Sequence, residues 1–131
     1  MKKYNSGKWT QARFNSFIKS ALRKATLRWG PKYEVLKDAQ TERKINPLSG
    51  KLAMMYICGI CKEEFPRTQI EVDHIEAVVP HTGFTTWDDV IHRMFCEEEG
   101  FIVLCKKCHK EKTVDEKQRR RNIKEVDRKR A

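Results

Sequence analysis

The segment Cys105-Lys106-Lys107-Cys108-His109 carries a C-x-x-C pair with a histidine directly after it, and a second pair, Cys58 and Cys61, lies upstream. Four thiols with this spacing are typical of a tetrahedral zinc site in which every ligand is a cysteine. Because the two pairs come from opposite ends of the central part of the chain, zinc would join those ends and stabilise the fold. His109 is left over as a candidate ligand for a second metal ion.

Between the two cysteine pairs lies Val72-Asp73-His74-Ile75, which places a carboxylate beside an imidazole in a β-branched run. Polar and apolar residues alternate over residues 69–73, which predicts a strand that ends near His74, with residues 75–79 as its hairpin partner. Neighbours on a strand point to opposite faces, so Asp73 and His74 can act on a metal ion and a water from different directions. The alternative is a chance Asp-His neighbour pair.

Length and composition limit the kinds of protein that this chain can be. Its 131 residues, 39% of them hydrophobic and 35% charged, suit one domain with an appended arm and a small core, and they exclude a large multi-part enzyme. A structural metal would stabilise such a core. No apolar run is long enough to cross a bilayer and no apolar signal region follows the first residues, so we expect a cytoplasmic protein without a membrane partner.

Cysteine usage agrees with an intracellular protein that binds metal. Five cysteines without a secretory signal are expected to stay reduced and to act as metal ligands, not to form disulfides. Cys96 belongs to neither C-x-x-C pair. It lies in an apolar-patterned segment, so we interpret it as a small buried side chain.

The net charge of +10 is unevenly distributed. Residues 1–51 carry +10, residues 52–105 carry −7 and residues 106–131 carry +7. Basic ends around an acidic centre suit a partner such as DNA, provided that cations bind in the centre. We therefore divide the chain into a basic helical N-terminal arm (1–51), a metal-binding core (52–115) and a basic C-terminal tail (116–131).

Hydrophobic periodicity predicts the helices and strands of an α+β fold. The first helix is expected from Thr10, its N-cap, to about Arg28, and a weaker one over residues 32–44. Another helix is expected over residues 86–97, with a cap at Thr86. We interpret the aromatic residues of the first helix as packing residues, with base stacking as the alternative.

The last predicted strand, residues 101–104, carries the second cysteine pair, and a helix follows from about Lys106. Its apolar residues become sparse, so we expect it to fray into a disordered basic end. Basic residues of the two ends are the candidate DNA contacts, with a solvated surface as the alternative. These are Arg23, Lys24, Arg28, Lys112, Arg119, Arg120 and Arg121. His92 is expected at the surface. His81 is closer to the candidate site, and contact with substrate is the less favoured interpretation of it.

Taken in order, C-x-x-C at 58–61, V-D-H-I at 72–75 and L-C-x-x-C-H-x-x-K-T at 104–113 resemble the HNH endonuclease family, in its subgroup with four zinc-binding cysteines. The resemblance covers Tyr56 to Thr113. The basic N-terminal region, with Lys8-Trp9-Thr10, is also similar to the leader of HNH proteins encoded by tailed bacteriophages.

The resemblance implies a ββα-metal fold, in which a hairpin at 72–79 packs on the helix that begins near Lys106. It implies that His74 is the general base, and that Asp73 and His109 bind a catalytic ion. It also implies a structural zinc held by four residues, Cys58, Cys61, Cys105 and Cys108. Phosphodiester hydrolysis needs an activated water and a cation, and an imidazole titrates near neutrality. Mg²⁺ or Mn²⁺ suits the oxygen-rich substrate, while the imidazole ligand also admits Ni²⁺, Co²⁺ or Zn²⁺.

The chain departs from the family pattern at two places. Gly100 stands where the family has a middle asparagine that ties down the hairpin loop and helps to orient the base. Glu76-Ala77 stands where a proline is common. The expected function is a metal-dependent DNA endonuclease that makes nicks or double-strand breaks. The alternative is a weak or inactive zinc-stabilised protein that keeps the same scaffold and binds DNA or a phage packaging partner.

Overall fold

The structure is a computed structural model that describes residues 2–130. The α-helices are α1 (Gln11–Ala25), α2 (Gly30–Asp38), α3 (Trp87–Met94) and α4 (Lys106–Arg130). The strands are β1 (Lys2–Tyr4), β2 (Trp9–Thr10), β3 (Gln40–Ile45), β4 (Leu52–Ile57), β5 (Glu64–Pro66), β6 (Ile70–His74) and β7 (Phe101–Cys105). Short 3₁₀ turns are η1 (Thr26–Arg28), η2 (Arg67–Gln69) and η3 (Glu98–Gly100). The predicted mixture of helix and sheet is confirmed.

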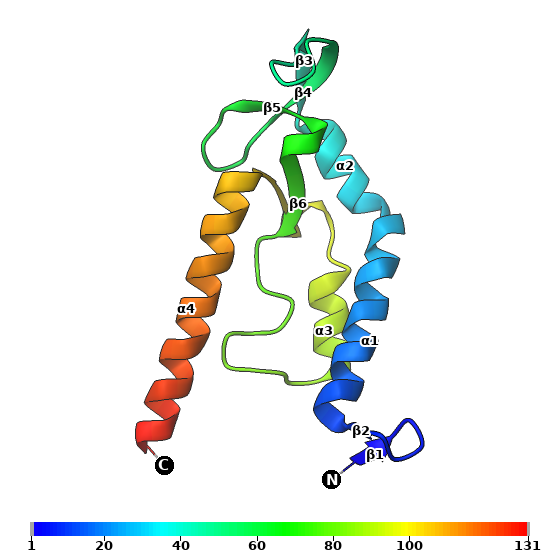
Figure 1. The fold of residues 1–131 in the computed structure, drawn as a ribbon, viewed down its shortest axis with the longest axis vertical. Helices are drawn as coiled ribbons and strands as arrows, with labels where there is room; N and C mark the ends of the chain where they lie inside the picture. Colours follow the sequence, from blue (N-terminus) through cyan, green and yellow to red (C-terminus); the bar gives the residue numbers. More distant parts are fainter. Residues whose placement is uncertain (1, 131) are drawn as a thin grey trace.

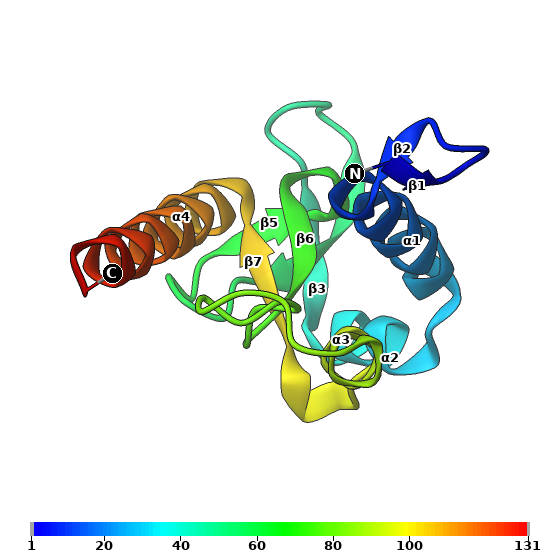
Figure 2. The ribbon, with the colours of Figure 1, turned by 90° about the horizontal axis from the view of Figure 1, so that it is seen from below.

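The strands form three small antiparallel sheets, β1-β2, β3-β4-β5 and β6-β7. The two ribbon views place α1 and α4 on opposite sides of β6 (Figure 1, Figure 2). Both helices extend toward the end of the molecule where the two termini lie (Figure 1). The region around β6 is therefore flanked by the two basic parts of the chain.

The first predicted helix is confirmed as α1, continued by the single turn η1. The Thr10 hydroxyl accepts a hydrogen bond from the Arg13 amide at 3.3 Å, which satisfies a free N–H of the first turn. Phe14 stacks on Tyr4 with 4.4 Å between ring centroids, so aromatic packing is confirmed for this pair. Leu22 contacts the core beside α3, although no residue of α1 is fully buried.

The second helix is shorter than predicted, and residues 40–44 form a strand instead. α2 ends at Asp38 and the chain continues as β3, which pairs with β4. Ala39 lies at the junction between α2 and β3. Its carbonyl accepts a hydrogen bond from the amide of Ile57 at 2.9 Å. Pairing with a distant strand thus overrides the weak helical pattern, because it satisfies backbone groups that a frayed helix end would leave free.

The predicted hairpin between β6 and residues 75–79 is wrong. β6 instead pairs with β7 along its whole length, from Ile70 opposite Cys105 to His74 opposite Phe101. Four of the five residues of β7 are buried, so pairing with this apolar strand gives β6 backbone hydrogen bonds inside the core. Residues 75–79 run as an irregular segment, and Val79 packs into the core near α3.

The core consists of three neighbouring clusters. One surrounds the cysteine pairs, one lies between α2 and the β4 and β6-β7 strands, and one lies between α3 and the loop after β6. Their buried members are Cys58, Leu104, Cys105 and Cys108, then Tyr56, Ile70 and Val103, then Val79, Val90 and Met94. The predicted third helix is confirmed as α3, although it ends at Met94 and not at residue 97. The Thr86 hydroxyl accepts a hydrogen bond from the Asp89 amide at 3.1 Å.

The C-terminal helix is longer than predicted. α4 runs without a break through Arg130, so the expected disordered end is wrong for the described residues, and the boundary at 115/116 falls inside the helix. Only Cys108 of α4 is buried, and the second half projects away from the core (Figure 1). Among residues 2–130, none of the helices has the length and apolar character that crossing a membrane requires.

Candidate metal centre and adjoining cleft

The four predicted cysteine ligands meet at one place. Cys58 and Cys61 lie in the turn after β4, Cys105 ends β7 and Cys108 lies in the first turn of α4. Their sulfur atoms all lie within 4.8 Å of one another. In a tetrahedral site with Zn–S bonds of about 2.3 Å, neighbouring sulfurs are about 3.8 Å apart, so the cluster has the dimensions of a zinc site.

The turn that carries the first pair is held against β7. The Gly59 amide donates to the Val103 carbonyl at 2.7 Å. A Cβ atom at Gly59 would come within 2.6 Å of the Ile102 side chain, so this close approach requires glycine. Backbone amides also donate to two of the sulfurs, from Cys105 to the Cys58 Sγ and from Cys108 to the Cys105 Sγ, each at 3.4 Å. Such bonds favour the thiolate form that binds metal.

The cysteines of the cluster differ in how readily they ionise. Burial disfavours a thiolate at Cys58, but backbone amide donors outweigh it and lower the pKa of Cys58 to about 6. The neighbouring Cys105 sulfur, together with burial, raises the pKa of Cys108 to about 12. One thiol therefore ionises easily and further charges are opposed, which a divalent cation would reverse. These thiols are free, as is Cys96, so the prediction of metal-ligating cysteines without disulfides is supported.

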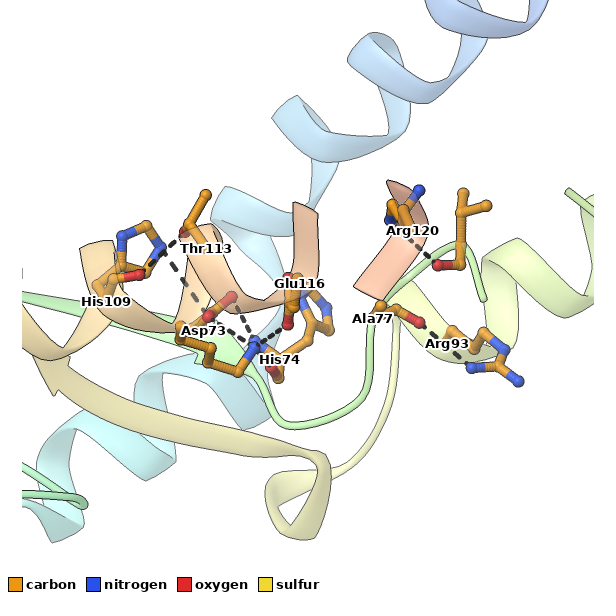
Figure 3. Close-up of polar contacts among 10 residues, drawn as sticks. Asp73, His74, Ala77, Arg93, His109, Thr113, Glu116 and Arg120 are labelled. Carbon is orange, nitrogen blue, oxygen red and sulfur yellow. Dashed lines mark hydrogen bonds and ion pairs between the residues drawn. The ribbon is translucent and has the colours of Figure 1, made fainter. Parts of the chain in front are cut away.

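The second predicted pair of ligands also comes together. β6 carries Asp73 and the first turns of α4 carry His109, and their Oδ2 and Nε2 atoms are 3.9 Å apart (Figure 3). His109 Nδ1 lies 3.2 Å from the Glu71 carboxylate, on the same strand as Asp73. A carboxylate at Nδ1 favours the tautomer with its proton there, which leaves the Nε2 lone pair on the side of Asp73. The sequence reasoning missed Glu71, although its i, i+2 spacing from Asp73 places both on one face of β6.

His74 is held by a backbone group that no sequence motif indicates. Its Nε2 lies 2.7 Å from the Met94 carbonyl oxygen, at the C-terminal end of α3. A carbonyl only accepts hydrogen bonds, so Nε2 carries the proton and the neutral ring has its lone pair at Nδ1. The ring also packs against Phe101, with centroids 4.9 Å apart. The imidazole is thus oriented with one nitrogen able to accept a proton.

Lys112, predicted as a DNA contact, lies within the site. Its ammonium is 3.0 Å from Asp73 Oδ2, 2.8 Å from the His74 carbonyl oxygen and 2.6 Å from Glu116 Oε1. Burial works against the charged form, but the carboxylates of Glu116 and Asp73 outweigh it and raise the pKa of Lys112. Asp73 therefore faces a permanent cation from α4 on one side and the His109 ring on the other (Figure 3).

A cleft of about 360 Å³ opens over Asp73 and His74. α1, α2, β6 and α4 all contribute to its walls. Its charged lining residues are five cations and two carboxylates: Lys19, Arg23, Lys32, Lys112, Arg120, Asp73 and Glu116. Of the other predicted DNA contacts, Arg119 lines a separate cavity of about 580 Å³ together with His81, and Lys24, Arg28 and Arg121 line neither cavity.

The remaining predicted positions lie outside this cleft. His92 is exposed on α3, as predicted. Cys96 is half-buried, and burial raises its pKa. Within residues 2–130, the four cysteines are the only group of three or more potential metal ligands that lie together, so Asp73 and His109 form a pair and not a closed site.

Comparison with known proteins places the chain in no family. No protein-family model matches it, and no curated protein or solved structure matches it significantly.

Proposed function

We propose that this protein is a metal-dependent DNA endonuclease of the HNH type, with a structural zinc in the cysteine cluster. The observation that supports this most is the contact of Asp73 with His109, beside a basic cleft that Asp73 and His74 line. The bond from His74 Nε2 to the Met94 carbonyl leaves Nδ1 able to accept a proton. β6, β7 and α4 supply two antiparallel strands followed directly by a helix, which suits a ββα-metal core.

The proposed reaction is attack of a water on a DNA phosphodiester. His74 Nδ1 takes the proton from the water, and the bond from Nε2 to the Met94 carbonyl holds the ring and stabilises the imidazolium that forms. Lys112, which already pairs with Asp73, adds positive charge where the phosphate would bind. Hydrolysis would leave a 5′-phosphate and a 3′-hydroxyl.

Asp73 and His109 are the residues that would hold the catalytic ion. Ligand bonds of about 2.1 Å place two ligand atoms about 3 to 4 Å apart, and their 3.9 Å separation fits this range. Bound Mg²⁺ or Mn²⁺ would stabilise the charge that develops on the phosphate and the leaving oxygen. The imidazole ligand also admits Ni²⁺, Co²⁺ or Zn²⁺.

The backbone of Gly100 takes over part of the role expected of the family's asparagine. Its carbonyl accepts a hydrogen bond from the Ile75 amide at 2.9 Å, directly after His74, and so ties down the loop that follows β6. A side chain here would collide with the Cys96 sulfur, so an asparagine does not fit this backbone. The loss of the amide side chain is therefore compatible with an active site.

Cleavage of supercoiled plasmid tests the proposal. Purified protein with Mg²⁺ or Mn²⁺ is expected to produce nicked or linear plasmid, and His74→Ala should lower the rate by about 100-fold or more. His92→Ala is the matched control, because His92 is exposed on α3 and outside the cleft. Plasmid that stays intact with every divalent ion, or equal rates for the wild type and His74→Ala, would contradict the proposal.

A second candidate is a zinc-stabilised protein that binds DNA or a packaging partner without cleaving it. The contact of Lys112 with Asp73 favours it, because an ammonium already neutralises the carboxylate. It predicts salt-sensitive DNA binding that Asp73→Ala and His109→Ala leave unaltered, and no cleavage. A gel shift at graded salt, run beside the plasmid assay, separates the two candidates.

A further inference from the structure

The N-terminal arm contributes cations to the cleft that contains Asp73 and His74. Lys19 and Arg23 come from α1, one helical turn apart, and Lys32 comes from α2. Residues at i and i+4 share a face of a helix, so Lys19 and Arg23 present their charges together. α2 is fixed to the β6-β7 sheet by Val35 and Leu36, which pack on the core. The arm is thus a wall of the cleft.

The cations of the two walls differ in their partners. On α4, Lys112 binds Asp73 and Glu116, and Arg120 donates to the Val79 carbonyl at 2.7 Å. Within residues 2–130, Lys19 and Arg23 have no carboxylate within ion-pair distance and their side chains make no hydrogen bond. Neighbouring cations that no carboxylate pairs with repel one another, so an anionic ligand would stabilise this wall.

We propose that Lys19 and Arg23 form a subsite for a backbone phosphate of the nucleic acid strand, next to the phosphodiester that reacts at Asp73 and His109. This inference rests on the proposed function and names how the substrate is held. A lysine and an arginine on one helix face suit phosphate oxygens, since both donate hydrogen bonds and keep their charge at neutral pH. The substrate class is then a polynucleotide with phosphates beyond the scissile one.

α1 and α4 lie on opposite sides of β6, so a strand that enters the cleft passes between the arm and α4 (Figure 2). Arg120 also lines the cleft, but its bond to Val79 holds the loop after β6, so its replacement would change structure as well as charge. Lys19 and Arg23 have no such bonds, which makes them suitable for substitution.

The experiment compares two substrates for the double variant Lys19→Gln/Arg23→Gln. Duplex DNA has phosphates that can occupy the subsite, whereas bis-nitrophenyl phosphate is a single diester without neighbours. We expect the loss of kcat/KM with DNA to exceed the loss with the small diester by about tenfold, and to arise mainly in KM. Equal losses with the two substrates would overturn the subsite.

The matched control is Lys37→Gln/Arg43→Gln, which removes one lysine and one arginine from exposed positions of the same arm outside the cleft. Binding of labelled duplex is measured from about 50 to 200 mM salt. The slope of log affinity against log salt should fall by about one to two for Lys19→Gln/Arg23→Gln, as expected for lost phosphate contacts, and by clearly less for the control. Equal changes in slope would indicate general charge attraction and overturn the proposal.

Failure of the endonuclease proposal gives a different result from failure of the subsite. If the wild type hydrolyses neither substrate, the nuclease is contradicted, but the binding comparison still tests the subsite. Repeating it in a His74→Ala background removes cleavage from the measurement. Weaker binding of Lys19→Gln/Arg23→Gln than of the control supports the subsite there, and equal binding overturns it.

Discussion

The cysteine cluster and the Asp73–His109 pair lie at the same end of α4, yet they are built differently. Three of the four cysteines are nearly inaccessible, with exposures of 0%, 3% and 6% for Cys58, Cys105 and Cys108. The side chains of Asp73 and His109 are 23% and 35% exposed, and Asp73 also lines the charged cleft. A closed set of four ligands suits a structural ion, whereas an open pair leaves coordination positions for water and substrate.

The two regions also differ in the groups that contact their side chains. In the part of the chain that the structure describes, the cysteine sulfurs accept hydrogen bonds from backbone amides and lie against one another. Asp73 pairs with the Lys112 ammonium, a flexible cation that any bound metal ion must tolerate or displace. We therefore expect the cysteine cluster to bind its metal permanently and the proposed Asp73–His109 site to exchange it.

The largest expected effect is on the closed centre. Cys108→Ser should lower the bound zinc from about one ion per chain to a small fraction and abolish the cooperative thermal transition, because structural zinc contributes about 10 kcal/mol or more in small sites. Metal analysis and circular dichroism measure this. Cys96→Ser is the control, since Cys96 lies outside the cluster. Full zinc content in Cys108→Ser would remove the distinction between the two centres.

A smaller effect is expected at the open centre. Lys112→Met removes the ammonium from Asp73 and leaves Glu116 without its partner. Mn²⁺ should then bind up to about fivefold more tightly, equivalent to about 1 kcal/mol for a partly exposed pair. Calorimetric titration of the zinc-loaded protein measures it, with Lys107→Met as control on an exposed position of α4. Weaker Mn²⁺ binding would show that Lys112 supports the site and does not compete with the ion.

The smallest expected effect concerns the orientation of His109. Glu71→Gln replaces the charged acceptor at Nδ1 by a neutral one, and Mn²⁺ affinity should fall by about threefold, less than for buried partners because Glu71 is half-exposed. Glu76→Gln, at a more exposed glutamate after β6, is the control. An equal change in both variants would mean that only general negative charge matters, and that His109 is not oriented by Glu71.

Local patterns in the sequence were enough to predict several parts of the molecule. The caps at Thr10 and Thr86 depend on a hydroxyl and an amide only three residues apart, so each could be read from a short segment. The spacing within each C-x-x-C pair likewise reports a turn with its own geometry. In contrast, the partner of β6 and the end of α2 depend on strands far along the chain, and both predictions failed there.

The candidate site likewise contains residues that the sequence indicated and contacts that it did not. Residue chemistry alone singled out the four cysteines, Asp73, His74 and His109. It did not reveal the Met94 carbonyl, whose backbone oxygen has no sequence signature, or the Glu71 contact with His109. Local charge alone did not distinguish Arg23 from Arg28, although only Arg23 lines the cleft.

The sequence by itself determined which side chains can bind metal, accept protons or attract phosphate, because these properties belong to residue types and short spacings. Only the tertiary structure decided which of them share a space. The pairing of β6 with β7 and the docking of α2 on that sheet bring an N-terminal helix, a central strand and the C-terminal helix around one cleft. Contacts between residues so distant in the chain are set by packing of the whole core, which no local pattern encodes.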